Sequence, residues 1–425
     1  MTPHSPATKL WYVTATFPFK SPDTWNSQEM SFLARNFDDV VVLPEMLGSG
    51  SPPEQLEVNV SWSDGLARHM RLVYPAIWLL LTCTEARAFF LRCLMTLRRK
   101  DTWRVRPWWR VLKALGAASF FKKEMRQCSS EMLTVYCFWF TEAVVGAGIA
   151  KAALGRPIRI VARAHGYDLY DQERGRQFCA LRREQFRYVD TVLAVSEHGR
   201  AYLAEEAGEF HEKVAKCYLG FDDPALSVDL AVDRPEEISV LSVSYVHAFK
   251  RVPFIYEVVR CLAAEYRQKV RWLHIGGGPG FEELAQLALG DPVKNLDVKL
   301  LGSVAPQNVA EVYGSRYFDV FVHASLMEGL PASMIEALAW GIPIVATEAG
   351  GIRELVGTDA GRVLDRAARP LEVAEAIVDL RSSGRLMHCR RGARARFEAD
   401  FRSDRAWDQL LSHLASSKPV GQIDE

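Results

Sequence analysis

The chain has 425 residues and a mass of 47.8 kDa, which predicts two or three domains and is ample for a full hydrophobic core. Apolar residues make up 49% and charged residues 24% of the chain, an ordinary globular composition that argues against long disorder. The 52 basic and 52 acidic residues cancel, so the chain taken whole is not a generic nucleic-acid binder.

Short apolar runs alternate with helical patterns along the first half of the chain. We expect strands at 10–16, 40–43, 133–139, 158–162 and 191–195, with a helix near 28–35. This alternation predicts βαβ units and a parallel sheet.

No segment of this half predicts a signal peptide or a membrane span. Residues 1–9 lack the apolar core of a signal peptide, and the longest apolar stretch, residues 72–83, is shorter than the roughly 20 residues that a spanning helix needs. The eight cysteines form no CxxC pair, which indicates reduced thiols and no zinc site. We therefore expect a cytoplasmic protein.

The overall charge balance hides a basic block between Arg87 and Arg126. Twelve basic residues in this block face two acidic ones, so the block carries +10 and the remainder −10. Trp103, Trp108 and Trp109 are interleaved with the cations. Three interpretations stay open for the block: an element on an anionic bilayer, a nucleic-acid site, or a solvated helix pair.

A second series of strands is expected at 238–243, 270–275, 298–301, 320–323 and 344–346, with helices at 253–267, 281–289 and 331–340. The weakly periodic segment between the two series contains two prolines and several aspartates. We predict two doubly wound α/β domains, 1–222 and 223–399, facing a central cleft, with ligands at the carboxyl ends of the strands. A C-terminal helix at about 400–417 is expected to pack back on the first domain.

The most informative segment follows the strand expected at 320–323. Glu328 stands in the loop after this strand, and Pro331 suits the first turn of the next helix. The N–H groups of the first turn, from about Leu330 to Ser333, would then form an anion site at a helix N-terminus, although Pro331 itself supplies none. Glu336 lies further along the same helix, and a carboxylate can accept two hydrogen bonds from vicinal hydroxyls. Taken alone, either glutamate would be interpreted as an ordinary solvated side chain with no function in binding.

The whole segment resembles the retaining family-4 glycosyltransferases of the GT-B fold. The resemblance rests on two glutamates eight apart, followed by Ala-Leu-Ala-x-Gly-x-Pro-x-Val-Ala-Thr and Gly-Gly-x-x-Glu, and it spans most of 10–411. It is best to the subgroup that builds bacterial capsular and exopolysaccharide repeat units, of the colanic-acid type. The resemblance implies that Glu328 contacts the transferred sugar and Glu336 the ribose. It also implies that the amides around Gly329 and Leu330, together with Ser333, bind the donor.

The same resemblance points to cations after the strand at 238–243. The family usually has Gly-Arg-Leu and then Lys-Gly here, with Arg and Lys neutralising the donor diphosphate. Lys250 matches the lysine, whereas Tyr245 stands at the arginine position and Arg251 at the glycine position. We expect Lys250 to bind the diphosphate, with Arg251 as a weaker candidate. A surface Lys-Arg pair is the alternative.

Another family position falls after the strand at 158–162. The family commonly has a histidine there that meets the donor sugar, which implies this role for His165. Asp168 is a further candidate, and Arg163 can equally be a structural salt-bridge partner. The Phe17-Pro18 pair and Glu29 resemble the acceptor-side loop of the subgroup.

The glycine-rich run at 276–280 is out of register for GxGxxG, because Phe281 occupies the last glycine position. We interpret it as a structural turn near the donor, which disfavours a Rossmann oxidoreductase. Val304, in the loop after the strand at 298–301, is expected to lie beside the nucleobase.

These observations predict a hexosyltransferase of bacterial surface polysaccharide biosynthesis. A UDP- or GDP-sugar would be the donor and a lipid-linked glycan the acceptor, with retention at the anomeric carbon. The sequence shows no Asp-x-Asp triplet, so we expect metal independence and no cofactor. A lipid-linked acceptor favours the membrane interpretation of the basic block, peripheral on the inner face of the plasma membrane, over nucleic acid. The alternatives are a nucleotide-sugar epimerase of the same fold and a non-catalytic membrane scaffold.

Overall fold

The computed structural model describes residues 8–19, 25–48, 56–98, 105–130, 132–170, 181–224, 236–290, 292–382 and 384–415. Contacts divide the chain into two compact units. Unit 1 comprises Met1–Cys217 and Trp407–Glu425, and unit 2 comprises Tyr218–Ala406. The sequence predicted the boundary a few residues later, at 222/223.

Unit 1 contains a seven-stranded sheet in the order β3-β2-β1-β4-β5-β6-β7, with every neighbouring pair parallel. The strands are β1 (Thr8–Thr14), β2 (Asp39–Pro44), β3 (Val60–Trp62), β4 (Met132–Cys137), β5 (Arg159–Ala164), β6 (Thr191–Ala194) and β7 (Val214–Lys216). The five strands expected in this half are confirmed to within a few residues. The doubly wound arrangement is confirmed as well, because the strand order reverses between β1 and β4.

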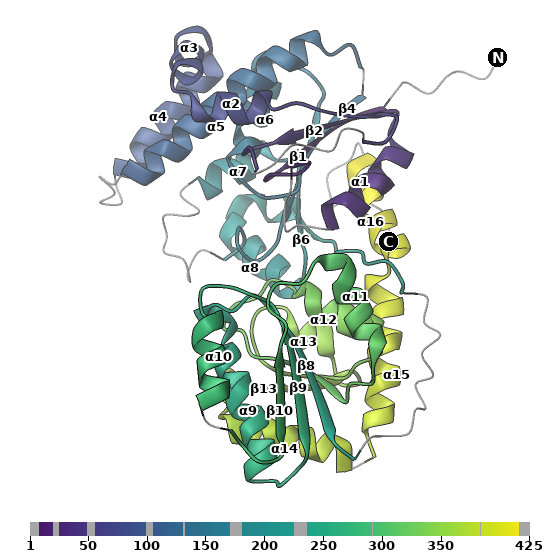
Figure 1. Cartoon of the computed structure of the whole chain (residues 1–425). Coiled ribbons are helices and arrows are strands. Elements are labelled where there is room, and N and C mark those ends of the chain that lie inside the picture. The colour runs from purple at the N-terminus through teal and green to yellow at the C-terminus, as the bar shows by residue number, and fades with distance from the viewer. Residues whose placement is uncertain are drawn as a thin grey trace, which may run out of the picture. The chain divides into compact units, whose positions relative to one another are not determined.

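The helices of unit 1 are α1 (Trp25–Asn36), α2 (Gly65–Arg71), α3 (Tyr74–Thr82), α4 (Thr84–Arg98), α5 (Val105–Gln127), α6 (Glu142–Leu154), α7 (Arg182–Tyr188), α8 (Glu197–Ala207) and the 3₁₀ helix η1 (Gly208–Lys213) (Figure 1). No helix in the described part of the chain combines the length and apolar character that a membrane span requires. Helices α5 and α6 pack closely, since a Cβ on Gly146 would lie 2.5 Å from the Cβ of Ala117.

The described part of the basic block lies on α4 and α5, whereas residues 99–104, which include Trp103, lie outside the described residues. Part of the charge on the two helices is neutralised inside unit 1. The Arg92 guanidinium lies 2.9 Å from a carboxylate oxygen of Glu184, and Arg110 pairs with Glu142. The apolar side of α5 joins the core of the unit through residues such as Val111 and Leu115. The cations of this block are therefore not all available to an external partner.

Unit 2 contains a six-stranded parallel sheet in the order β10-β9-β8-β11-β12-β13. The strands are β8 (Ile238–Val243), β9 (Val270–Ile275), β10 (Leu296–Leu300), β11 (Val320–His323), β12 (Ile344–Thr347) and β13 (Gly361–Leu364). Strands β8, β9 and β11 begin and end where the sequence predicted. The second doubly wound domain is thus confirmed.

The helices of unit 2 are the 3₁₀ helix η2 (Ala248–Lys250), α9 (Val252–Ala264), α10 (Phe281–Gly290), α11 (Pro306–Ser315), α12 (Ala332–Ala339), α13 (Ile352–Val356), α14 (Pro370–Ser382) and α15 (Leu386–Arg396). A π-helical turn, η3 (Phe397–Phe401), follows, and α16 (Ser403–Ala415) ends the described chain. The second part of α16 belongs to unit 1, where Leu410 and Leu414 lie in the core with Leu10 and Tyr12.

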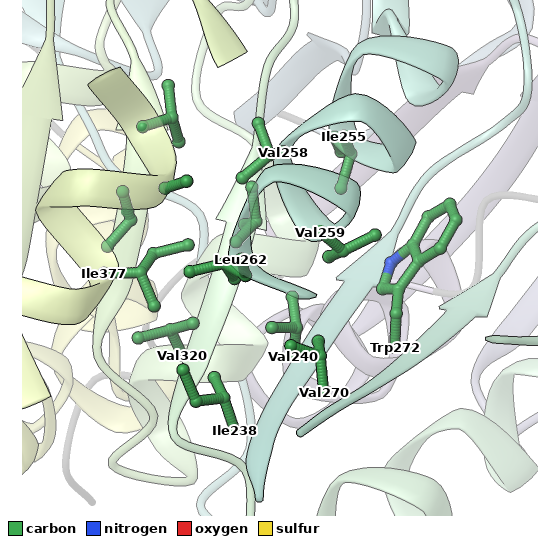
Figure 2. Close-up of a cluster of buried hydrophobic side chains, with 14 of the residues drawn as sticks. Ile238, Val240, Ile255, Val258, Val259, Leu262, Val270, Trp272, Val320 and Ile377 are labelled. Atoms are coloured by element: carbon green, nitrogen blue, oxygen red, sulfur yellow. The ribbon is translucent and has the colours of Figure 1, made fainter. Parts of the chain in front are cut away.

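Figure 2 shows how α9 covers the sheet of unit 2. Ile255, Val258, Val259 and Leu262 recur at the spacing of one helical face and are buried against the strands. Trp272 on β9 is fully buried among them, and its indole N–H donates to the Ser242 hydroxyl at 2.9 Å. This packing fixes the positions at which the central strands end.

Candidate functional site

The centre of the unit 2 sheet is a topological switch point. Strands β8 and β11 are neighbours, but the chain continues from them toward opposite edges of the sheet. In doubly wound sheets such a point leaves a crevice outside the carboxyl ends of the two strands, where ligands bind. Lys250 follows β8 and Glu328 follows β11, so the fold brings these two predicted residues to the switch point.

Lys250 and Glu328 form an ion pair with a third partner, His323. The Lys250 Nζ lies 2.5 Å from Glu328 Oε1, and His323 Nε2 lies 2.9 Å from the same oxygen. Burial alone would raise the pKa of Glu328, but the Lys250 ammonium and His323 lower it to about 2. Glu328 is therefore a carboxylate across the physiological pH range, held in place by two donors.

His323 is the site residue that sequence reasoning missed. It is the last residue of β11 and is buried, with 3% of its surface exposed. The sequence signal that could have identified it is a polar residue at the carboxyl end of an otherwise apolar strand.

The N-terminus of α12 lies beside this pair in the sequence and carries no side-chain cap. The helix begins at Ala332, and Pro331 is its N-cap in extended conformation; the expectation of Pro331 in the first turn was wrong by one residue. Within the described residues, the backbone N–H groups of Gly329, Leu330, Ala332 and Ser333 donate to no protein acceptor. Such N–H groups, together with the helix dipole, favour an anion.

Glu336 lies one turn further along α12 and is half-buried. Burial raises the pKa of this carboxyl to about 7, and a hydrogen bond with Tyr313 opposes the shift only in part. The Tyr313 oxygen lies 2.9 Å from the Ser333 carbonyl oxygen, a second acceptor for the same hydroxyl hydrogen, which fixes the tyrosine against the first turn of α12. Glu336 thus changes its charge near neutral pH, whereas Glu328 does not.

Arg251 is committed to the framework of unit 2. Its Nε donates to the Ala324 carbonyl at 2.6 Å, and a terminal nitrogen donates to the Thr347 hydroxyl at 2.8 Å. The guanidinium also lies over the Phe254 ring at 4.7 Å. These contacts tie together the ends of β11 and β12, a structural function that the sequence did not predict.

The glycine-rich turn after β9 makes a very close backbone approach. A Cβ on Gly276 would lie 1.8 Å from the Ser244 carbonyl oxygen, and Gly276 has a φ of 141°. Its N–H donates to the Gly302 carbonyl at 2.8 Å, which holds the loop that carries half-exposed Val304. The side chain of Tyr245 is exposed at the position where the family has arginine.

In unit 1, His165 follows the end of β5 and is buried against two neighbouring aromatic rings. Its ring centroid lies 4.6 Å from that of Phe138 and 4.4 Å from that of Trp139. Neither imidazole nitrogen has a hydrogen-bond partner among the described residues. Burial, reinforced by the Arg163 cation, holds the pKa of His165 well below its usual range, so the ring is neutral. A neutral imidazole with both nitrogens unpaired can donate to and accept from a ligand.

Asp168 positions the backbone around His165. Its two carboxylate oxygens accept from the N–H of His165 at 2.8 Å and of Phe140 at 2.7 Å. Burial raises the pKa of Asp168 to about 6, although these hydrogen bonds oppose the rise. The loops that follow β4 and β5 are therefore joined by this carboxyl.

Arg163 and Glu29 form a buried ion pair. The Arg163 guanidinium is fully buried and lies 2.5 Å from Glu29 Oε2, and the Tyr12 hydroxyl lies 3.1 Å from the other oxygen. Arg163 is thus a salt-bridge partner, one of the two roles that the sequence allowed. Glu29 is its counter-ion, and the resemblance of Glu29 to the acceptor-side loop of the subgroup stays a prediction.

No group of three or more His, Cys, Asp or Glu side chains in the described ranges is arranged to hold a metal ion. The Lys250 ammonium and the N–H groups near Glu328 offer positive charge to an anion.

Comparisons with known proteins show what the chain is similar to. Residues 237–383 match the family model "Glycosyl transferases group 1". Over 339 residues the chain is 27% identical to "Putative colanic acid biosynthesis glycosyltransferase WcaL" of Escherichia coli (strain K12), which covers 76% of this chain and 81% of WcaL. Over 276 residues it is 26% identical to N-acetyl-alpha-D-glucosaminyl L-malate synthase of Bacillus anthracis, covering 62% and 69% of the two chains.

Among solved structures, Anabaena Alr3699/HepE in complex with UDP matches 96% of this chain and 100% of its own, with a TM-score of 0.65 and 17% identity. This likeness extends over both units and establishes the fold. The two doubly wound sheets and this structural likeness show the GT-B fold, and the family match in unit 2 and the two relatives support a glycosyltransferase.

Proposed function

We propose that the protein transfers a hexose from a nucleoside-diphosphate sugar to a lipid-linked glycan, with retention of anomeric configuration, in bacterial surface polysaccharide biosynthesis. The observation that carries this proposal is the Lys250–Glu328 pair at the switch point of unit 2, next to the uncapped N-terminus of α12. This arrangement offers one cation and several free N–H groups to an anion, and one fixed carboxylate to hydroxyl groups.

The proposed donor site uses these groups for different parts of the nucleotide-sugar. The N–H groups of residues 329, 330, 332 and 333 and the Lys250 ammonium bind the diphosphate. Glu336 accepts hydrogen bonds from the ribose hydroxyls and Glu328 from hydroxyls of the transferred sugar. Val304 lies at the nucleobase. The complex of Anabaena HepE with UDP-glucose supports a nucleotide-sugar of this class.

The proposed reaction breaks the bond between the anomeric carbon and the diphosphate oxygen and forms one to the acceptor oxygen on the same face. The departing diphosphate takes the acceptor proton, and Lys250 with the α12 amides stabilises its negative charge. His165, neutral and with both ring nitrogens unpaired among the described residues, hydrogen-bonds a sugar hydroxyl. Under this proposal the Lys250 ammonium and the α12 amides replace a divalent metal, so transfer should continue unchanged in a chelator.

The acceptor and the cellular location form part of the same proposal. The WcaL relative carries a name from colanic acid biosynthesis, which supports a bacterial surface polysaccharide as the product. Because a lipid-linked acceptor would require the enzyme to work at a membrane, we propose a protein at the cytoplasmic face of the plasma membrane, in contact with anionic lipid.

A thermal-shift panel of UDP-, GDP- and ADP-sugars tests the donor. A ligand at about 100 times its Kd stabilises the folded protein by about 2.7 kcal/mol, so the correct nucleotide should raise the Tm clearly above the others. If none of them raises the Tm, the proposed donor class is wrong.

A transfer assay with the lipid-linked acceptor then tests the reaction. Glu328→Gln should lower the transfer rate by roughly 100-fold or more, since charge at a fixed position in the site is lost. Glu283→Gln, which changes an exposed glutamate on α10, is the matched control and should have no effect. If the protein interconverts donor sugars in the absence of acceptor, the result would favour the epimerase. If it shows no turnover of the donor, the result would favour the non-catalytic scaffold.

A further inference from the structure

Helix α3 exposes an apolar face on the surface of unit 1. Tyr74, Ile77, Trp78 and Leu81 recur at the spacing of one helical face, and each is between 52% and 69% exposed. The opposite face, with Pro75, Ala76 and Leu79, is buried. The helix is therefore apolar on both sides, although only one side is covered by protein in the described structure. In Figure 1, α3 stands at the margin of unit 1, beside α2 and α4.

The exposed apolar surface continues onto α4. The Arg87 guanidinium of α4 donates to the carbonyls of Leu80 and Leu81, at 3.3 and 3.1 Å, and so marks where α4 meets the end of α3. Leu91 and Met95 follow Arg87 at four and eight residues, share its helical face, and are 56% and 64% exposed. We call this surface the α3–α4 face; it comprises Leu72, Val73, Tyr74, Ile77, Trp78, Leu81, Leu91 and Met95.

The exposed charges of the segment that carries the α3–α4 face have one sign. Among the described side chains of residues 64–97, the exposed charged ones are Arg68, Arg71 and Arg87. The two acidic residues of the segment are half-buried, and Asp64 forms an ion pair with Arg68, so the net positive charge of the exposed surface comes from Arg71 and Arg87. An apolar surface bordered by exposed arginines complements a partner that offers both hydrocarbon and negative charge.

We propose that the α3–α4 face docks on the surface of a bilayer that contains anionic phospholipid. Helix α3 has nine residues and is about 14 Å long, so it lies along the interface. Tyr74 and Trp78 occupy the headgroup boundary, where aromatic side chains with one polar group are favoured, and Ile77 and Leu81 enter the acyl region. The arginines meet the lipid phosphates.

This inference deepens the proposed function. It rests on that function because a lipid-linked acceptor would bring the enzyme to a membrane. It also changes where the contact lies. The sequence placed the membrane surface in the basic block 87–126, whereas the exposed apolar residues begin before that block, at Leu72. Apolar insertion, not charge alone, then supplies the attachment.

Flotation of the full-length protein with vesicles tests the proposal. We expect the wild type to bind vesicles of phosphatidylcholine mixed with phosphatidylglycerol, and to bind phosphatidylcholine alone at least tenfold less. The double substitution Trp78→Ser with Leu81→Ser should reduce partitioning at least tenfold. Leu289→Ser is the matched control, because Leu289 is 82% exposed on α10 of unit 2, and it should partition like the wild type. Equal binding by the double variant and the wild type would overturn the proposal.

The charge component has its own variant. Arg68→Gln with Arg71→Gln should weaken binding to the anionic vesicles and reduce its salt dependence, and should leave the weak binding to phosphatidylcholine unchanged. The substituted side chains are exposed, so the variants should fold like the wild type, and circular dichroism of each variant checks this.

Sedimentation velocity without lipid tests whether the α3–α4 face binds a second copy of the chain. If the wild type dimerises and Trp78→Ser is monomeric, the face joins two copies of the chain and the lipid proposal is wrong.

Failure of this inference and failure of the proposed function can be told apart. Donor binding is measured in solution by the thermal shift, without vesicles. Donor binding with no vesicle binding would overturn only the docking face. Vesicle binding with no donor binding would overturn only the proposed activity.

Discussion

At the scale of single residues, unit 2 separates two carboxylates by their surroundings. Glu328 has a pKa of about 2 because two donors share one of its oxygens, whereas Glu336 has a pKa of about 7 because burial dominates. The same side-chain type is thus a permanent anion in one place and a titrating group in the other. Chemistry that needs a constant negative charge falls to Glu328.

His323 is expected to act through Glu328 as a positioning residue. His323→Phe removes the contact at 2.9 Å and should lower kcat about 10- to 100-fold, with a small change in KM for the donor. His323→Gln, which restores an N–H donor, should recover part of the rate. His274→Phe is the control: His274 is equally buried in unit 2 but contacts Ser242, so it should lower the Tm and leave kcat unchanged. A Tm loss without a kcat loss in His323→Phe would show a purely structural role.

Glu336 should make stability depend on pH near neutrality. Its folded pKa of about 7 exceeds the ordinary value of 4.5, so the folded state binds the proton more tightly. The resulting stabilisation is complete below pH 4.5 and is lost as pH rises through about 7, to a total of at most about 3 kcal/mol. Urea unfolding at about pH 5 and about pH 8 should therefore show a smaller pH difference for Glu336→Gln than for the wild type. Glu283→Gln should keep the wild-type difference.

At the scale of elements, the predicted strands were correct where a continuous apolar run was bounded by turns, as at Ile238–Val243 and Val270–Ile275. The edge strands Val60–Trp62 and Val214–Lys216 have three residues each, too few to show a period. The helix Tyr74–Thr82 was missed because it is apolar on both faces, which removes the amphipathic signal on which sequence reasoning depends.

The turn after β9 should tolerate no side chain at Gly276. Gly276→Ala would place a Cβ 1.8 Å from the Ser244 carbonyl oxygen at a φ that disfavours alanine, and should cost about 2 to 5 kcal/mol of unfolding free energy. Gly290→Ala, at the end of α10 with no atom within 4 Å of the added Cβ, should change stability by less than about 1 kcal/mol. Equal unfolding free energies for the two variants would show that the turn is not constrained in this way.

At the scale of the whole molecule, the two doubly wound units follow from the alternation of strands and helices, and the sequence predicted both. The site was predictable only in part. Lys250 and Glu328 came from a resemblance, since nothing in their spacing of 78 residues indicates a contact. That contact depends on the order β8–β11 in the sheet, which places distant segments side by side, and the part played by His323 depends on the same order.

The C-terminal end of the described chain should stabilise the N-terminal strands. Leu410 is fully buried in the core of unit 1, so Leu410→Ala should cost about 2 to 5 kcal/mol and speed hydrogen exchange in β1 and β2 more than in β8 and β9. Asp408→Ala, at an exposed position of the same helix, should leave exchange unchanged. Faster exchange confined to unit 2 would contradict the assignment of this helix to unit 1.

The ion pair between Arg163 and Glu29 affects how mutational scans of this enzyme should be read. Removing either partner leaves the other charged and buried, a defect that commonly costs 3–5 kcal/mol. An alanine scan scored by activity in cells would rank both positions as highly as Glu328, for loss of folded protein. Normalising the rates to the amount of folded protein separates positions needed for folding from positions needed for the reaction. Joint replacement of Arg163 and Glu29 by apolar residues of similar volume should restore the activity, whereas an apolar residue at position 328 should not.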